Sequence, residues 1–242
     1  MATIRRQLSE LGGTLCELVL PLPCPGCGGA GPFCTGCGAA LGGRPREPVL
    51  TEAAVEALAE AGPLPSVRAL CRYTAGVRAA VIAGKERGRR DLPPVLGTAL
   101  GDGLLRLHGV GLVPDRVTLV PAPTKVAAAR RRGGDPVHRM ARAAAASMAR
   151  AGLAAAVAPV LSTARSAADQ AGLDASARAG NLAGRVRFRG RLPEDPGQIV
   201  LLDDVLTTGA TMVAACAALS RHGAEVGLVL TVASVPKFRS VR

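Results

Sequence analysis

Apolar runs of strand length alternate with longer helical patterns through most of the chain. The strand-length runs cover residues 66–73, 117–120, 157–161, 199–202 and 224–232. The helical patterns cover residues 76–84, 92–107, 137–150 and 212–219. Strands that alternate with helices predict an α/β fold, in which a parallel sheet is flanked by helices and binds ligands at the carboxyl ends of its strands.

The run at residues 199–202 leads into the most informative stretch of the chain. It is an uninterrupted Ile-Val-Leu-Leu, which suits a strand buried on both faces, and Asp203 and Asp204 follow it directly. Small polar residues then lead into an alanine-rich helical pattern: Thr207, Thr208, Gly209 and Thr211. This order predicts a phosphate site, because backbone N–H groups and the positive end of the helix dipole point at the anion.

The two carboxylates need a different partner, because they would repel a phosphate. They suit ribose hydroxyls, or a Mg²⁺ ion that bridges a sugar and a pyrophosphate. The simpler alternative is a buried strand followed by a capped helix, with Asp203 and Asp204 as the caps. That alternative explains one acid and one threonine but not the whole set, so the stretch predicts a phosphorylated ribose as the ligand.

Residues 203–211 also resemble a known motif. Their sequence, Asp-Asp-Val-Leu-Thr-Thr-Gly-Ala-Thr, is similar to the phosphoribosyl pyrophosphate (PRPP) signature of type I phosphoribosyltransferases. The resemblance implies the type I phosphoribosyltransferase fold, with Asp203 and Asp204 as the catalytic acids. It also implies a PRPP-binding loop made of Val205, Leu206, Thr207, Thr208, Gly209, Ala210 and Thr211.

Four of the seven cysteines form two Cys-x-x-Cys-Gly motifs: Cys24, Cys27, Cys34 and Cys37. Each motif sets two thiolates one tight turn apart, followed by a glycine that can take positive φ beside a metal. Two such motifs supply the four sulfur ligands that Zn²⁺ prefers, so we expect a small zinc-ribbon-like module with a structural zinc ion. Disulfide or redox use is the alternative, which a reducing cytoplasm disfavours.

Two further segments are candidates for contact with the ligand. A basic loop after residues 117–120 carries Lys125, Arg131 and Arg132, which can bind the pyrophosphate that leaves the ribose. A solvated basic helix face is the alternative for any one of them. The basic turn at residues 85–90 is expected to be a solvated loop, and a role facing the substrate is the alternative.

The segment at residues 162–191 is polar and has weak core periodicity. It is expected to be either disordered or a lid that closes over the substrate, and a lid is favoured beside a phosphoribose site. The polar residues assigned to this lid are Gln170, Arg178 and Asn181.

Composition narrows the classes of partner. Hydrophobic residues make up 48% of the chain and aromatic residues 2%, so the core must be aliphatic. The net charge of +12 favours polyanionic partners, although the scarcity of aromatic residues argues against a platform on which nucleic-acid bases stack. No apolar segment reaches the roughly 18 residues of a membrane span, and we expect a cytoplasmic protein.

These observations divide the 242 residues into three parts. Residues 1–45 are expected to hold an N-terminal helix and the cysteine module. Residues 46–65, rich in glycine and proline around a short helical piece, read as a linker. Residues 66–242 form the phosphoribosyltransferase-like domain.

The combination of these features resembles the ComF family of competence-associated, phosphoribosyltransferase-like proteins. The resemblance covers most of the chain, from the cysteine motifs through Val120-Pro121-Ala122-Pro123 and Arg131-Arg132-Gly133 to the PRPP loop. Two positions depart from it: Gly134-Asp135-Pro136 replaces an aromatic residue followed by Asn-Gln, and Ala177 replaces an acid.

The family resemblance implies a Mg²⁺-dependent phosphoribosyltransferase that binds PRPP and transfers its phosphoribosyl group to an acceptor. The alternative is a module without catalysis, which holds PRPP or a nucleotide, or binds single-stranded DNA during DNA uptake. No residue pattern in the chain selects a purine, a pyrimidine or an amine as the acceptor.

Overall fold

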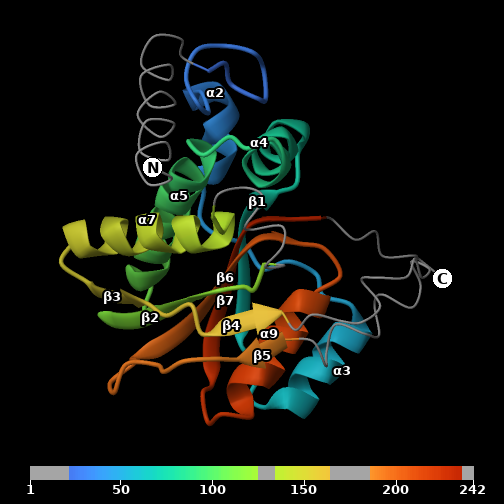
Figure 1. The fold of residues 1–242 in the computed structure, drawn as a ribbon, viewed down its shortest axis with the longest axis vertical. Helices are drawn as coiled ribbons and strands as arrows, with labels where there is room; N and C mark the ends of the chain where they lie inside the picture. The colour runs from blue at the N-terminus through green and yellow to red at the C-terminus, as the bar shows by residue number, and fades with distance from the viewer. Residues whose placement is uncertain (1–21, 125–133, 164–185, 236–242) are drawn as a thin grey trace, which may run out of the picture.

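A five-stranded parallel sheet forms the centre of the protein in the computed structural model, which describes residues 22–124, 134–163 and 186–235. The strands in chain order are β1 (Ser66–Arg72), β2 (Arg116–Pro121), β3 (Ala154–Val157), β6 (Gln198–Leu206) and β7 (Val226–Ser234). Their order across the sheet is β1-β7-β6-β2-β3, and all neighbouring pairs are parallel (Figure 1). The predicted parallel α/β architecture is confirmed.

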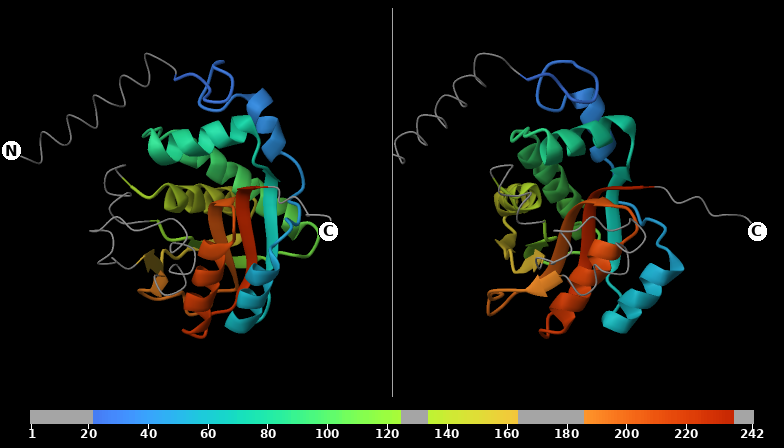
Figure 2. Two further views of the ribbon diagram at one scale, coloured as in Figure 1. Left: turned by 90° about the vertical axis from the view of Figure 1, so that its right-hand side faces the viewer. Right: turned by 45° about the vertical axis from the view of Figure 1, so that its right-hand side comes forward.

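Helices cover both faces of this sheet (Figures 1 and 2). One face carries α4 (Ala75–Glu86), α5 (Leu92–His108) and α7 (Pro136–Arg150), and the other carries α3 (Glu52–Ala61) and α9 (Ala210–Ser220). Because successive side chains of a strand point to opposite faces, Leu202 of β6 packs in the layer of α4, α5 and α7, and Leu201 packs in the layer of α3 and α9. The apolar core is therefore split by the sheet into two parts.

Strand β6 is buried at the centre of the sheet. Val200, Leu201 and Leu202 have no exposed surface, as expected for a central strand covered by helices on both faces. Burying each of these side chains stabilises the fold by about 1.5–3 kcal/mol. The strand therefore holds its carboxyl end firmly in place.

Glycines bring α5 and α7 unusually close together. A Cβ atom at Gly101 would lie 2.6 Å from Cβ of Ser147 and 2.9 Å from the carbonyl oxygen of Ala144, and one at Gly97 would overlap the backbone of Met140. The two helices thus approach to a separation that a larger residue at either position would prevent.

The apolar run at residues 157–161 is not a single strand. Strand β3 ends at Val157, and β4 (Leu161–Thr163) leaves the sheet to pair antiparallel with β5 (Val186–Phe188). Pro159 lies between the two strands, and a proline cannot donate to a sheet ladder. The prediction of one strand here is wrong because the run joins two elements.

The segment at residues 46–65 is packed against the α/β domain. Arg46 and Ala69 exchange backbone hydrogen bonds of 2.8 and 2.9 Å, and Thr51 caps α3 by accepting from the Ala54 N–H. Leu58 of α3 is only 2% exposed and lies in the same apolar layer as α9. The proline-rich stretch therefore carries a helix that covers one face of the sheet.

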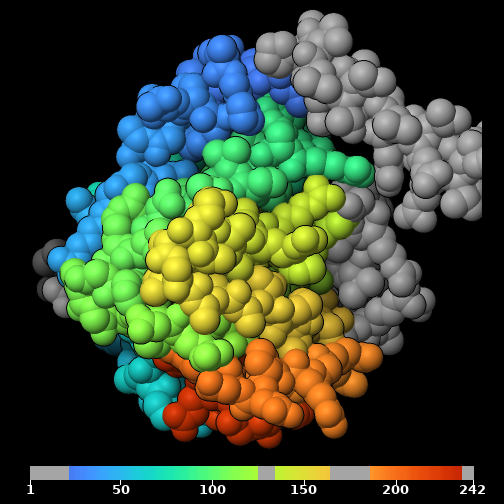
Figure 3. Space-filling model, turned by 90° about the vertical axis from the view of Figure 1, so that its left-hand side faces the viewer, coloured from blue at the N-terminus to red at the C-terminus, as the bar shows by residue number. Residues whose placement is uncertain are grey.

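The cysteine module lies on the layer formed by α4 and α5, as the blue and green surfaces of Figure 3 show. It contains a short helix, α2 (Thr35–Gly38), and a 3-10 turn, η1 (Ala39–Leu41). The expected N-terminal helix lies outside the described residues. Within the described part of the chain, no helix combines the length and the apolar character needed to cross a membrane.

Candidate functional site

The acid pair lies on strand β6 where its neighbour β2 has already ended. The last β2 residue, Pro121, pairs with Leu202, and the Ala122 N–H donates to the Leu202 carbonyl over 2.8 Å. On its other side β6 continues to pair with β7, from Asp203 as far as Leu206. The expectation that the acids follow the strand is corrected, because pairing with β7 carries the strand four residues further.

The sheet changes direction at this point. Strand β2 leads into α7 on one face, whereas its neighbour β6 leads into α9 on the other face. Loops that leave adjacent parallel strands toward opposite faces open a crevice between them, and α/β proteins bind ligands in such crevices. The predicted acids and threonine loop therefore lie at the switch point of the sheet.

The threonine loop connects β6 to α9. Thr207 and Thr208 are exposed, and the Thr208 hydroxyl accepts a hydrogen bond of 3.4 Å from the Ala210 N–H. Gly209 takes φ of 85° and is the residue that precedes the helix. The first N–H groups of α9 have no acceptor within the helix, so the loop offers hydroxyl and amide donors at the positive end of the helix dipole.

Two residues of the predicted PRPP loop serve the strand instead. The Val205 N–H donates to Oδ1 of Asp204 over 2.8 Å, and the Leu206 carbonyl accepts from the Val235 N–H over 3.0 Å. The Leu206 side chain is buried. Among the described loop residues, Thr207 through Thr211 are therefore the ones placed to donate to an anion.

The two acids have different surroundings. Asp204 is 3% exposed, and its Oδ2 lies 2.7 Å from Nζ of Lys85. This oxygen accepts no hydrogen bond of good geometry from the described residues, so the ion pair is what offsets its burial. Asp203 keeps part of its surface exposed, and its Oδ1 accepts from the Asp204 N–H over 2.8 Å.

The charge on Asp203 is unfavourable in the folded protein. Desolvation within the fold, and then the neighbouring Asp204 carboxylate, raise the pKa of Asp203 well above its ordinary value, while Lys85 opposes the shift. Tyr73, which follows β1, shares this environment. Burial and the Asp204 charge raise the pKa of its hydroxyl.

The sequence analysis missed Lys85, which it assigned to a solvated turn. The residue belongs to the last turn of α4, which runs to Glu86. Val77 and Val81 are buried, and Lys85 follows them at the same four-residue spacing. This spacing places all three on one face of the helix, and it is the signal by which the contact with the core was detectable.

The basic loop is closed at its base by a hydrogen bond. The Thr124 hydroxyl donates to Oδ1 of Asp135 over 3.0 Å, and the same oxygen caps α7 by accepting from the Val137 and His138 N–H groups. The predicted pyrophosphate ligands Lys125, Arg131 and Arg132 lie between these ends, outside the described residues. Asp135 thus starts α7 and closes the base of the loop.

The expected lid segment begins and ends beside this loop. Thr163 pairs with Val186 in the β4–β5 ribbon, and the Thr163 hydroxyl donates to the Thr124 carbonyl over 3.5 Å. The predicted lid residues Gln170, Arg178 and Asn181 lie outside the described residues. The bases of the basic loop and of the lid segment therefore meet at Thr124.

The four predicted zinc ligands form one cluster. The Sγ atoms of Cys24, Cys27, Cys34 and Cys37 all lie within 4.8 Å of one another. Zn–S bonds of 2.3 Å in a tetrahedron set sulfur atoms about 3.8 Å apart, so the cluster can bind a metal such as zinc. Burial alone would raise the pKa of Cys24, but backbone N–H groups, chiefly that of Cys34, lower it to about 6. All four residues are free thiols in the structure.

The cysteine module contacts both ends of α4. A Cβ at Gly26 would lie 2.8 Å from Sγ of Cys37 and 3.2 Å from Cα of Gly76, which shows how closely the first motif packs on the start of the helix. After the helix, Arg89 donates to the Pro23 carbonyl over 2.9 Å and pairs with Asp91. The cysteine module therefore contacts the chain near the start of α4, at Gly76, and just after its end, at Arg89.

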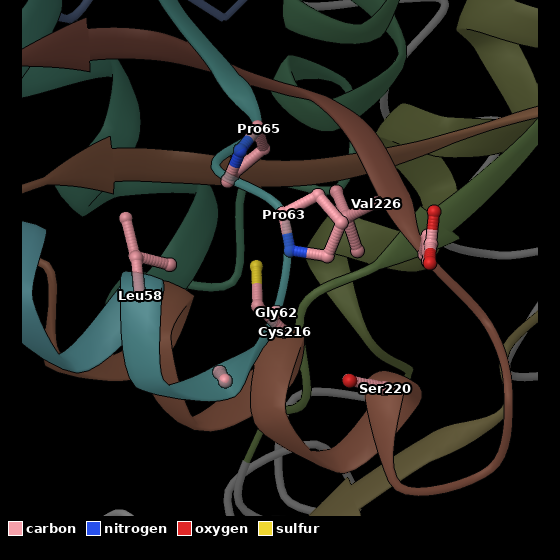
Figure 4. A pocket seen from close by; sticks show the side chains of 9 residues that line it. Leu58, Gly62, Pro63, Pro65, Cys216, Ser220 and Val226 are labelled. Carbon is pink, nitrogen blue, oxygen red and sulfur yellow. The ribbon is translucent and has the colours of Figure 1, made fainter.

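A small hollow lies near the amino ends of β1 and β7, between α3 and α9 (Figure 4). Its walls include Leu58, Pro63, Cys216 and Ser220, and its volume of about 10 Å³ leaves room for about one water molecule at most. Burial raises the pKa of Cys216 to about 12, so this thiol stays protonated at neutral pH. The hollow offers neither room nor chemistry for a substrate.

The chain matches no protein-family model, and a search among curated proteins finds no match. The assignment of a function therefore rests on the residues of the site.

Proposed function

We propose that the protein binds PRPP together with Mg²⁺ and acts as a type I phosphoribosyltransferase. The observation that carries the proposal is the position of the acid pair and the threonine loop on one strand, at the point where the sheet changes direction. An α/β sheet binds its ligand at this point, and this donor set suits a phosphorylated sugar.

Each part of PRPP has a matching group at this edge of the sheet. The 5'-phosphate meets the hydroxyls of Thr207 and Thr208 and the first N–H groups of α9. The ribose hydroxyls donate to the carboxylates of Asp203 and Asp204. The pyrophosphate meets the basic loop, which follows the neighbouring strand β2 and whose base is held by the hydrogen bond between Thr124 and Asp135.

The chemistry follows from the charges that this arrangement supplies. Departure of pyrophosphate leaves positive charge at the anomeric carbon of the ribose. Carboxylates fixed near that carbon stabilise the charge, since preorganised groups need no rearrangement during the reaction. A bound Mg²⁺ would offset the negative charge of the pyrophosphate. The partly exposed Asp203 offers the oxygen ligand that this ion prefers, and Asp204 is the second donor.

Thermal unfolding of the purified chain with PRPP and Mg²⁺ tests ligand binding. At a hundredfold excess over Kd, the ligand should stabilise the protein by about 2.7 kcal/mol, which corresponds to about 5–10 °C for a chain of this size. Thr208→Ala should remove most of the shift. Thr98→Ala is the matched control, because the exposed Thr98 hydroxyl on α5 donates only to the Pro94 carbonyl.

Release of pyrophosphate separates an enzyme from a binding module. A phosphoribosyltransferase releases pyrophosphate from PRPP when a panel of purines, pyrimidines and amines includes its acceptor. Salt-sensitive binding of single-stranded oligonucleotides without pyrophosphate release would support the binding module instead. Absence of any PRPP-dependent stabilisation would refute both the enzyme and the PRPP sensor.

A further inference from the structure

The Asp204 side chain is buried and both of its oxygens have partners, although the proposed ligand needs its carboxylate. Its side chain is 4% exposed. Oδ1 accepts from the Val205 N–H over 2.8 Å, and Oδ2 pairs with Nζ of Lys85 over 2.7 Å. Both carboxylate oxygens are thus engaged, so a ligand reaches Asp204 only if one of these contacts is exchanged.

The contact that can be exchanged is the one with Lys85. Asp204 lies on a central strand and cannot leave its position without breaking the pairing of β6 with β7. The Lys85 side chain is 39% exposed, so its ammonium group can turn toward water without becoming a buried, unpaired charge. The ion pair therefore joins one fixed partner to one movable partner.

The position of Lys85 is set by its helix. It lies in the last turn of α4, where a cation interacts favourably with the helix dipole. The cysteine module holds the two ends of this helix near Gly76 and Arg89. Among the described residues, the other charged or titratable groups that act on this region are Asp203, Tyr73, Arg78 and Glu86, and the ion pair of Asp204 is formed with Lys85.

We propose that Lys85 is a built-in counter-ion that occupies the cation position beside Asp204 until a divalent cation displaces it. The inference takes the identity of the ligand from the proposed function. Lys85 and the divalent cation compete for the same carboxylate oxygen, because a single oxygen cannot hold both at contact distance. The protein without PRPP therefore binds divalent cations weakly, and Lys85 is a positioning residue that sets this affinity.

Titration of the full-length protein with Mn²⁺ measures this competition without PRPP. The protein is first loaded with zinc at its cysteine cluster, and binding of Mn²⁺ is followed by electron paramagnetic resonance. Removing the competing cation in Lys85→Gln should tighten Mn²⁺ binding about tenfold, within the usual range of coupling between two ligands. The control is Arg87→Gln, which removes the same charge from an exposed position two residues away and should change the affinity little. Lys85→Arg keeps the charge and should bind Mn²⁺ like the wild type.

Equal or weaker Mn²⁺ binding by Lys85→Gln than by Arg87→Gln would overturn the inference. If Lys85→Gln fails to fold, the wild type provides a second test through chemical labelling of its lysines. The chain has only three lysines, Lys85, Lys125 and Lys237, so each can be followed separately. In the wild type, saturating Mn²⁺ should raise the labelling of Lys85 by an amine reagent relative to Lys237, as read by mass spectrometry, and unchanged labelling would contradict displacement.

The outcomes separate this inference from the proposed function. Displacement of Lys85 by Mn²⁺ in a protein that PRPP does not stabilise would refute the function and leave the exchange at Asp204 standing. Stabilisation by PRPP without displacement of Lys85 would support the proposed function and refute the exchange at Asp204.

Discussion

Lys85 and Asp204 meet across two layers of the fold, with Nζ of the lysine 2.7 Å from Oδ2 of the aspartate. The lysine comes from α4 and the aspartate from the central strand β6. Their pairing makes the two acids unequal, because Asp204 is neutralised inside the protein while Asp203 remains partly exposed beside it.

Replacing Asp203 by asparagine should stabilise the protein at neutral pH. Desolvation and Asp204 raise the pKa of Asp203 in the folded state, so the folded protein holds its proton more tightly than the unfolded chain. The associated stability is complete below the unfolded pKa and is lost as the pH rises through the folded pKa. Asparagine does not ionise, and its Oδ1 can still accept from the Asp204 N–H.

Urea unfolding from pH 4 to pH 8 measures this effect. The gain in free energy of unfolding of Asp203→Asn over the wild type should be small near pH 4 and grow as the pH rises. Asp102→Asn, an exposed acid on α5, is the control and should show no such trend. A gain that is constant with pH would mean that the charge of Asp203 is not its source.

Gly209→Ala should destabilise the protein and remove ligand binding. An alanine at φ of 85° costs about 1–2 kcal/mol, and its Cβ would lie 3.3 Å from Cε of Met212 and 3.4 Å from Cβ of Ala54. Gly223→Ala is the control, since φ is 72° there and a Cβ meets nothing within 4 Å. Chemical unfolding should show a cost for both variants, whereas only Gly209→Ala should lose the PRPP-dependent thermal shift.

Gly101→Ala should cost about 1–3 kcal/mol through overpacking. The gain in helix propensity, at most about 1 kcal/mol, does not offset the contact of a new Cβ with Ala144 and Ser147 of α7. The control is Gly109→Ala at the end of the same helix, where the nearest atom would be 3.6 Å away. Equal midpoints of chemical unfolding for the two variants would show that α7 moves to accommodate the new Cβ at no cost in stability.

Cys37→Ser should lose the bound metal. One of four sulfur ligands is removed from the cluster, and elemental analysis should fall from about one zinc ion per chain to near zero. Cys71→Ser is the control, because Cys71 lies outside the cluster and donates to the Val232 carbonyl, a bond that serine can keep. Zinc content that is the same in both variants would place the metal elsewhere.

The hydrophobic pattern predicted the helices and most strands because local signals agreed with the tertiary structure. The apolar run at residues 117–120 became β2, and the helical pattern at residues 137–150 became α7, which starts at a proline preceded by the capping Asp135. At residues 157–161 the pattern failed, because an apolar run does not reveal that the chain leaves one sheet and enters another.

The site could be predicted only where its residues are close in sequence. Strand, acids and threonine loop are consecutive, so their order was sufficient to place them together. The spacing of Lys85 from Val77 and Val81 places the lysine on the buried face of its helix. No local pattern identifies Asp204, more than a hundred residues away in the sequence, as its partner. The end of β6 was also misjudged, because aspartate disfavours strands and only the pairing with β7 keeps Asp203 and Asp204 in one.

The glycine contacts between α5 and α7 have a consequence for how this protein tolerates change. With aromatic residues at 2% of the chain, the interior lacks bulky side chains that fill space between distant backbones. Backbones that approach one another at Gly97 and Gly101 fill it instead. At these two glycines the α5–α7 contact has no volume to spare for growth, whereas the neighbouring Leu96, Leu100 and Leu104 are fully buried and have volume to lose by truncation. Mutational scanning should therefore find that an added methyl group is as poorly tolerated at Gly97 and Gly101 as a truncation is at the buried leucines of the same helix.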